Sequence, residues 1–164
     1  MPNNDESFMQ IAIEAAKQAE QLGEVPIGAC LIDKNGEVLA VCGNRTITNC
    51  DPTAHAEILV IREAAKKISN YRLTDTTIYT TIEPCAMCAG SLVHARIKRL
   101  VFGSHDTRFG AVESVFNLCD TSSLNHQLEI TSGVSAEECR QIMQDFFKRK
   151  RAAKIPNSTF QIPN

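Results

Sequence analysis

The chain has 164 residues, a length typical of one domain, residues 1–164, built around one hydrophobic core. Hydrophobic residues make up 43% of it and charged residues 22%, which excludes a disordered or fibrous protein. The net charge is −2, yet residues 145–154 alone carry +4 and the remainder carries −6. Such a basic run is typical either of a solvated helix face or of a surface that binds a polyanion.

Neither end of the chain nor its apolar runs suggest a membrane protein. The longest apolar run, residues 25–32, contains Pro26 and Gly28 and is far shorter than the roughly 18 residues of a membrane span. Residues 1–6 lack the basic start and apolar stretch of a secretion signal. We therefore expect no membrane partner and a cytoplasmic location, where the seven cysteines are mostly thiols.

Hydrophobic periodicity predicts alternating helices and strands. In chain order these are a helix over 11–22, strands over 27–33 and 37–42, a helix over 54–68, a strand over 76–82, a helix over 85–95, strands over 99–102 and 128–131, and a helix over 136–150. Asn35-Gly36 is a strong hairpin signal between the first two strands. Asp51-Pro52-Thr53 supplies the capping chemistry that begins the second helix.

The order of these elements predicts an α/β fold. The strand, helix, strand unit over residues 76–102 favours a right-handed crossover and a parallel strand pair, whereas the hairpin is antiparallel. We therefore predict a three-layer α/β/α fold around a mixed five-stranded sheet. A basic C-terminal helix, 136–151, follows it, and a flexible tail is expected over 152–164.

Two short motifs, each at a predicted helix start, carry the chemistry: His55-Ala56-Glu57 and Pro84-Cys85-Ala86-Met87-Cys88. Cys85 and Cys88 are three apart and so share one helix face. With His55 they offer the nitrogen and sulfur ligands that suit Zn²⁺, and they leave a fourth position for water. A carboxylate at Glu57 could act on that water without binding the metal.

The pattern leaves other readings open. Residues two apart point in nearly opposite directions within a helix, so His55 and Glu57 can address one site only where the helix begins. A closed structural zinc site would need a fourth ligand, for which Cys50, His94 and Cys119 are the available types. A redox cysteine pair would have no need of His55 or Glu57.

His-x-Glu followed by Pro-Cys-x-x-Cys is the signature of zinc nucleobase deaminases. From about Phe8 to Arg151 the chain resembles, more narrowly, the bacterial tRNA-specific adenosine deaminase family of the cytidine deaminase superfamily. The segments that carry this resemblance are 51–57, 70–73, 83–90, 101–103, 125–126 and 145–148. It implies a cytidine-deaminase-like fold, one zinc per subunit, a homodimer, and hydrolysis of adenosine to inosine at the wobble position of a tRNA anticodon.

The resemblance also implies roles for single residues. His55, Cys85 and Cys88 match zinc ligands, Glu57 matches the group that moves protons, Asn44 matches a residue that hydrogen-bonds the flipped base, and Asp106 matches a loop position near the substrate backbone. From the basic run we add three RNA contacts, Lys148, Arg149 and Arg151. The chain departs from the family where Ser104-His105 replaces an Ala-Arg pair and where residues 107–109 replace a Lys-containing counterpart.

Two other functions remain as alternatives. A guanine deaminase, or another deaminase of free purines or nucleotides, shares the zinc signature, but a small purine needs no basic helix. A non-catalytic zinc subunit that binds RNA could dispense with Glu57.

Overall fold

A computed structural model describes residues 4–153 of the chain. The described part contains α1 (Asn4–Gln21), β1 (Gly28–Ile32), β2 (Val38–Gly43), α2 (Ala56–Ile68), β3 (Thr77–Ile82), α3 (Ala86–His94), β4 (Arg99–Ser104), β5 (Glu129–Ser132) and α4 (Ala136–Ala153). None of these helices is long and apolar enough to span a membrane.

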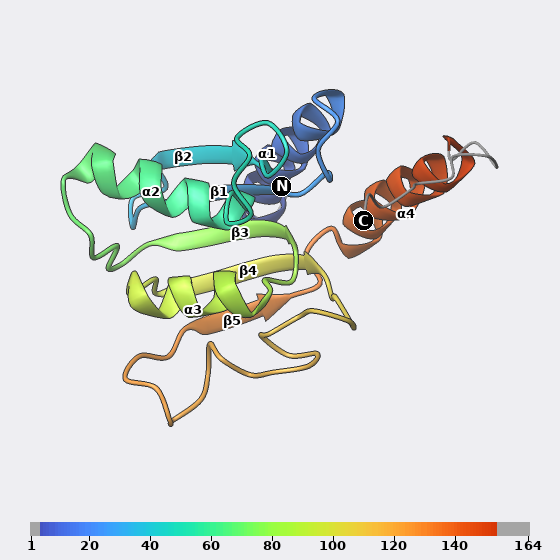
Figure 1. The fold of residues 1–164 in the computed structure, drawn as a ribbon. Helices are drawn as coiled ribbons and strands as arrows, with labels where there is room; N and C mark the ends of the chain where they lie inside the picture. The colour runs from blue at the N-terminus through green and yellow to red at the C-terminus, as the bar shows by residue number, and fades with distance from the viewer. Residues whose placement is uncertain (1–3, 154–164) are drawn as a thin grey trace, which may run out of the picture.

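The five strands form one mixed sheet in the order β2-β1-β3-β4-β5. β1 pairs antiparallel with both β2 and β3, whereas β3, β4 and β5 are parallel to one another. Helices α2 and α3 cover one face, and α1 covers the other, which α4 joins at its amino end (Figure 1). The three-layer α/β/α prediction is therefore confirmed.

Alternation along the strands divides the core between the two faces of the sheet. Ile78 and Phe102 belong to the cluster beneath α2 and α3, whereas Tyr79 and Val101 belong to the cluster beneath α1 and α4. All four side chains are at most 2% exposed. Because strand neighbours point to opposite faces, one strand serves both clusters.

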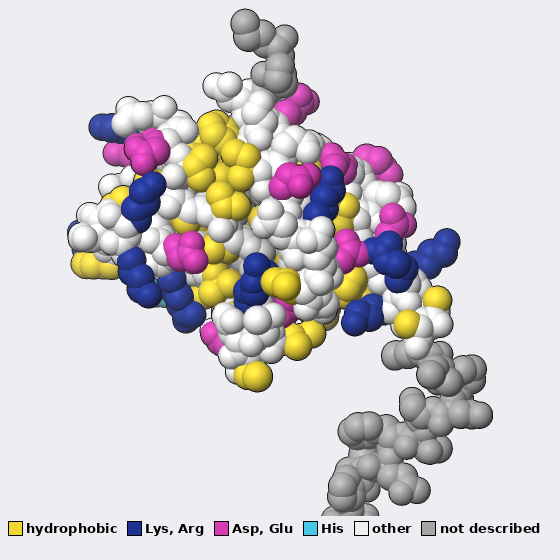
Figure 2. All heavy atoms as spheres, turned by 90° about the horizontal axis from the view of Figure 1, so that it is seen from above, with side chains coloured by type: hydrophobic (Ala, Val, Ile, Leu, Met, Phe, Trp, Pro, Cys, Tyr) yellow, Lys and Arg dark blue, Asp and Glu magenta, His cyan; other side chains and the backbone are white. Residues whose placement is uncertain are grey.

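Helix α4 extends away from the sheet. Only Cys139 and Phe146 are buried along it, and the helix projects beyond the edge of the sheet (Figure 1). Basic side chains gather at its carboxyl end, shown in dark blue at the right of Figure 2. The helix continues to Ala153, so the predicted end at residue 150 or 151, with a tail from 152, was too early. The rest of the predicted tail, 154–164, lies outside the described residues.

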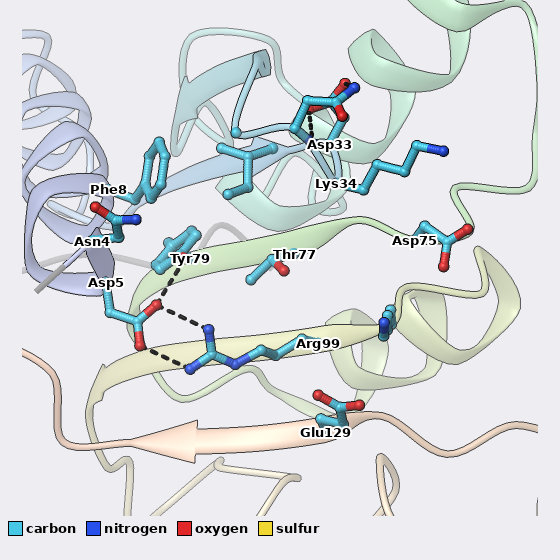
Figure 3. Close-up of a pocket in the computed structure, with 14 residues that line it drawn as sticks. Asn4, Asp5, Phe8, Asp33, Lys34, Asp75, Thr77, Tyr79, Arg99 and Glu129 are labelled. Carbon is cyan, nitrogen blue, oxygen red and sulfur yellow. Dashed lines mark hydrogen bonds and ion pairs between the residues drawn. The ribbon is translucent and has the colours of Figure 1, made fainter.

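Helix α1 begins at Asn4, seven residues before the predicted start at residue 11. Its first turn is held by Asp5, whose carboxylate accepts two hydrogen bonds from the Arg99 guanidinium, at 2.9 and 2.8 Å, and one from the Tyr79 hydroxyl, at 2.9 Å (Figure 3). The Arg99 contact lowers the pKa of Asp5. This polar turn is therefore stabilised by strands β3 and β4 rather than by an apolar face.

Gly28 permits the close approach of α1 to β1. A Cβ atom built at Gly28 would lie 1.9 Å from the carbonyl oxygen of Ala12 and 2.6 Å from the amide nitrogen of Ala16. Both contacts are with backbone, which no side-chain rotation can relieve.

We predict that Gly28→Ala lowers the free energy of unfolding by about 3 kcal/mol or more, because α1 must move away from the sheet. Gly90→Ala is the matched control: no atom lies within 4 Å of a Cβ at that helical position. Replacing this mid-helix glycine should leave stability unchanged or raise it by about 0.5–1 kcal/mol. Urea unfolding of both variants checks this, and equal stabilities would contradict it.

Candidate metal centre and active site

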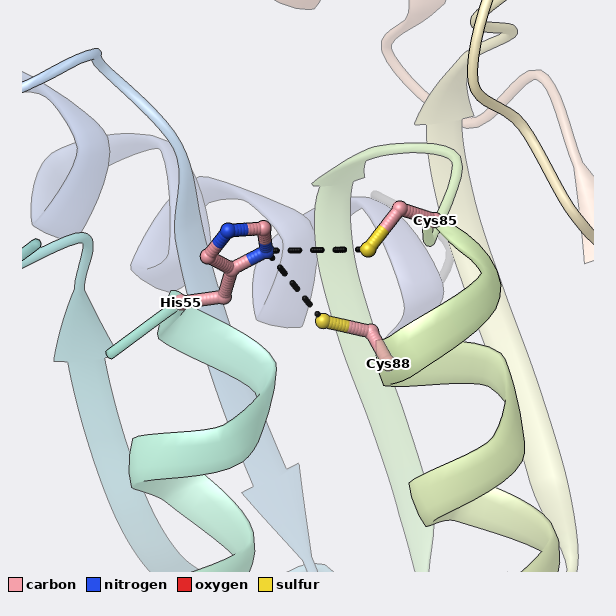
Figure 4. A group of neighbouring side chains, drawn as sticks. All are labelled: His55, Cys85 and Cys88. Carbon is pink, nitrogen blue, oxygen red and sulfur yellow. Dashed lines mark hydrogen bonds between the residues drawn. The ribbon is translucent and has the colours of Figure 1, made fainter. Parts of the chain in front are cut away.

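Two helices begin side by side at the carboxyl end of β3, and the residue before each one points into the space between them (Figure 4). His55 precedes α2 with φ −71° and ψ 151°, and Cys85 precedes α3 with φ −72° and ψ 175°. Both residues are extended, and neither side chain caps its own helix. Both side chains are therefore available to a ligand.

His55, Cys85 and Cys88 form a group that could hold a metal ion. Nδ1 of His55 lies 3.7 Å from Sγ of Cys85 and 3.4 Å from Sγ of Cys88. All three donor atoms lie within 4.8 Å of one another. Within residues 4–153 no fourth His, Cys, Asp or Glu joins this group, so Cys50, His94 and Cys119 do not complete a closed site. Three protein ligands with an open position are typical of catalytic metal sites.

The thiol of Cys85 is poised to ionise. Hydrogen bonding with Cys88 and with His55 outweighs partial burial and lowers the pKa of Cys85 to about 4. The thiolate is the form of cysteine that binds metal. Cys85 is thus available as a thiolate ligand, whereas the pKa of Cys88 is raised by its hydrogen bond with Cys85 and by burial.

Glu57 is buried beside these three side chains. It lies in the first turn of α2 and is 4% exposed, and burial raises the pKa of its carboxyl. Oε1 accepts a long hydrogen bond of 3.5 Å from the Thr80 hydroxyl. Among the described residues, Oε2 is the only buried side-chain oxygen or nitrogen that lacks a hydrogen-bond partner. An orphaned acceptor of this kind points to a missing donor, such as water or substrate.

The helix start explains how His55 and Glu57 serve one site. His55 is extended while Glu57 is already helical, so the two side chains need not point in opposite directions as they would within a helix. The predicted helix start at Ala54 was two residues too early, because Ala54 and His55 precede the first helical turn.

Asn44 lies in the loop that leads to α2. Its amide N–H donates to the carbonyl of Ile27, and the next residue, Arg45, donates to the carbonyl of Ala54. The Asn44 side chain is 5% exposed, and its Nδ2 lies 3.4 Å from a carboxylate oxygen of Glu24. The structure therefore brings Asn44 close to the residue that precedes His55.

Glu24 is a residue that sequence reasoning missed. Its carboxylate is fully buried and accepts hydrogen bonds from the backbone and hydroxyl of Thr48, at 2.6 and 2.8 Å, and from Ile47 and Thr46. Burial alone would raise the pKa of Glu24, but these bonds outweigh it and hold the pKa below its ordinary value. Nothing in the sequence distinguishes this glutamate from a surface charge.

Glu83 is a second buried carboxylate that holds a loop, on the opposite side of the site from Glu24. Its carboxylate accepts hydrogen bonds from the amides of Asp106, Glu113 and Ser114, at 3.0, 2.7 and 2.8 Å, and from the Ser114 hydroxyl. Although buried, it keeps a lowered pKa because of these donors. Its place directly before Pro84-Cys85 was the available signal for a role at the site.

Asp106 is half-buried, and its carboxylate accepts hydrogen bonds from the loop amides of Arg108 and Phe109.

The three basic residues predicted from the run at 145–154 have different surroundings. Lys148 and Arg151 line a groove of about 650 Å³ that also receives Arg108 from the loop after β4. The guanidinium of Arg149 instead pairs with Glu20 on α1. The structure thus brings two of the three into one basic groove with Arg108.

Comparison with known proteins identifies relatives of the whole domain. Residues 3–151 match the MafB19-like deaminase family. The chain is 51% identical to a tRNA-specific adenosine deaminase of Haemophilus influenzae, covering 92% of this chain and 87% of that protein. It is 46% identical to a tRNA-specific adenosine deaminase of Bacillus subtilis, covering 92% and 95%.

Solved structures agree with this. One, from studies of A-to-I editing by tRNA:A34 deaminases at the wobble position, superposes with a TM-score of 0.80 at 42% identity, covering 83% of this chain and 98% of that one. A guanine deaminase from Bacillus subtilis is less similar, with a TM-score of 0.60 at 28% identity and coverage of 93% and 97%.

We predict that Glu24→Gln lowers the free energy of unfolding at neutral pH by about 1–3 kcal/mol, because an amide cannot accept all of the hydrogen bonds. The folded pKa of Glu24 lies below its ordinary 4.5, so its contribution is complete above that pH and is lost as the pH falls. The difference in free energy of unfolding between Glu24→Gln and wild type should therefore be smaller at about pH 4 than at pH 7. Urea unfolding at both pH values measures it, with exposed Glu14→Gln as control, and a constant gap would contradict it.

Proposed function

We propose that this chain, which belongs to the family of tRNA-specific adenosine deaminases, converts adenosine to inosine at the wobble position of a tRNA anticodon and releases ammonia. The observation that carries the proposal is the group of three ligand side chains beside a buried carboxylate whose Oε2 lacks a partner. A non-catalytic zinc subunit would have no use for that carboxylate. Greater identity to tRNA deaminases than to a guanine deaminase disfavours a free purine as substrate.

We propose Zn²⁺, one per chain, as the metal that His55, Cys85 and Cys88 hold. Zinc bonds of about 2.3 Å to sulfur and about 2.0–2.1 Å to nitrogen, at a tetrahedral angle, separate the two ligand atoms by about 3.6 Å. The observed separations of His55 Nδ1 from the two sulfur atoms, 3.7 and 3.4 Å, are close to this value. When bound, zinc supplies a nucleophilic oxygen from water at neutral pH.

Glu57 handles the protons of the reaction. Its free Oε2 takes a proton from the attacking water, which adds to C6 of the adenine ring. The same carboxyl passes this proton to N1 of the ring, then takes the second proton of the water from the new C6 hydroxyl and gives it to the departing amine. The C6–N bond breaks, so that one water is consumed and one ammonia leaves. No side chain caps the first turn of α3. The backbone amides of this turn stabilise the negative charge on the oxygen that attacks C6.

The surroundings of the site suit a nucleotide in a single-stranded loop. We assign Asn44 to hydrogen bonding with the flipped base and Asp106 to the ordering of the loop near the substrate backbone. Bases in an anticodon loop are already partly unstacked, which lowers the cost of flipping one into the pocket.

Phosphates of the anticodon stem-loop are the proposed ligands of the groove that Arg108, Lys148 and Arg151 line. Figure 2 shows how basic side chains concentrate at this end of α4. We further propose a homodimer, for which exposed Tyr71 and Met87 offer apolar surface, and a cytoplasmic location, which seven free cysteines favour.

The active-site proposal predicts opposite outcomes for two variants. Glu57→Ala should retain about one zinc per chain and lose roughly 10²- to 10⁴-fold in single-turnover rate, because only proton transfer is removed. Cys88→Ala should lose zinc and also thermal stability, because metal binding and folding are coupled. Elemental analysis and inosine formation in an anticodon stem-loop measure both. Near-normal turnover by Glu57→Ala, or zinc loss from it, would contradict these roles.

The groove proposal predicts that changing Lys148, Arg149 and Arg151 together to Ala weakens stem-loop binding equally for different tRNA sequences. Each lost phosphate contact should reduce the slope of log K against log salt by about 0.7–0.9. Arg149→Ala alone should matter least, because its guanidinium is already paired with Glu20. Single-turnover deamination at saturating RNA should stay within a few-fold of wild type. An unchanged salt slope would identify the run as a solvated helix face.

A further inference from the structure

Phe109 is an exposed aromatic side chain at the edge of the site. It is 67% exposed, whereas the next residue, Gly110, is buried. Gly110 forms a β-bridge with Cys85, and the amide of Ala111 donates to the carbonyl of Pro84. Phe109 is therefore adjacent in sequence to Gly110, whose backbone pairs with Cys85.

The exposure of Phe109 is imposed by a rigid loop. Its amide and that of Arg108 donate to the Asp106 carboxylate, at 3.1 and 3.0 Å. The Glu83 carboxylate accepts hydrogen bonds from the amides of Asp106 and Glu113, which lie on either side of Phe109 in sequence. A Cβ atom at Gly110 would lie 2.3 Å from the same carboxylate. The hydrogen bonds thus hold the backbone that carries Phe109, so this backbone loses little entropy when a partner binds.

Charge favours a nucleic-acid partner on one side of Phe109. Arg108 precedes it and reaches the groove shared with Lys148 and Arg151. Residues 110–128, on the other side, contain two acidic residues and no Lys or Arg. Phe109 therefore lies in sequence between Arg108, which lines the basic groove, and Gly110, whose backbone pairs with Cys85.

We infer that Phe109 is a stacking platform for an unpaired anticodon-loop base next to the deaminated nucleotide. The inference rests on the proposed function and deepens it. When one adenosine is flipped into the pocket, its neighbours in the loop lose a stacking partner. An exposed aromatic ring replaces that partner and tolerates any base, because every base has a π-face.

Phe116 provides a matched control. It belongs to the same loop, is 58% exposed, and donates its amide to the carbonyl of Gly110. It lies within residues 110–128, which contain no Lys or Arg. Replacing it removes a similar apolar surface without touching the proposed base contact.

The test compares Phe109→Ala, Phe109→Leu, Phe109→Trp and Phe116→Ala in binding to an anticodon stem-loop, by fluorescence anisotropy, and in single-turnover deamination. Phe109→Ala should raise Kd about 5- to 150-fold, the range for loss of one stacked base. Phe109→Trp should bind like wild type, Phe109→Leu should be weakened, and Phe116→Ala should be unchanged. The rate at saturating RNA should stay within a few-fold in all four.

Stem-loops that lack the base on one side or the other of the wobble adenosine identify the stacked base. With one of these two stem-loops, Phe109→Ala should no longer raise Kd above the wild-type value. The inference is overturned if Phe109→Ala or Phe109→Leu binds like wild type, if the penalty persists with both abasic stem-loops, or if Phe109→Ala changes the oligomeric mass. Failure of wild-type protein to form inosine would contradict the proposed function instead. Anisotropy needs no turnover, so it decides the stacking inference in either case.

Discussion

The site depends on two extended residues that precede two helices at one edge of the sheet. β3 leads directly to Cys85, and a backbone hydrogen bond from Arg45 to Ala54 holds the chain just before His55. Extended backbone at these positions lets the imidazole and the thiol point between the helices, where Cys88 completes the group. A helical conformation at His55 would turn it away from Glu57. The grouping of the three candidate metal ligands beside the buried Glu57 carboxyl therefore follows from where each helix begins.

Two buried carboxylates hold the loops on either side of this edge. Glu24 fastens the loop that carries Asn44, and Glu83 fastens the loop that carries Asp106 and Phe109. Each accepts several amide or hydroxyl hydrogen bonds, which compensate for removing a charge from water. Loops fixed in this way bind a flexible RNA loop without first having to become ordered themselves.

Local spacing was sufficient to predict that His55, Cys85 and Cys88 come together. Cys85 precedes α3 and Cys88 lies in its first turn, so the spacing of three keeps the two thiols close wherever that helix packs. Glu57 follows His55 at a helix start that Asp51-Pro52-Thr53 signals. The mixed sheet was likewise predictable from the hairpin and the strand, helix, strand unit. The sequence resemblance narrowed the function, and relatives that cover most of the chain support it.

What the sequence did not reveal depends on contacts between distant residues. The first turn of α1 is polar, and Arg99, which holds Asp5 there, is 94 residues away. Glu24 acts on a loop more than 20 residues later, and that loop must fold back before the carboxylate finds its donors. The pairing of Arg149 with Glu20 likewise depends on how α4 meets α1. No local pattern encodes such contacts.

The most direct test of the account is a substrate comparison with zinc-loaded protein: an anticodon stem-loop with adenosine at the wobble position, the same stem-loop with adenosine only at the neighbouring positions, free adenosine, and free guanine. Inosine, xanthine and ammonia are measured in each. The account predicts inosine with an equal amount of ammonia from the first substrate alone. Xanthine from guanine, without inosine in the stem-loop, would contradict it.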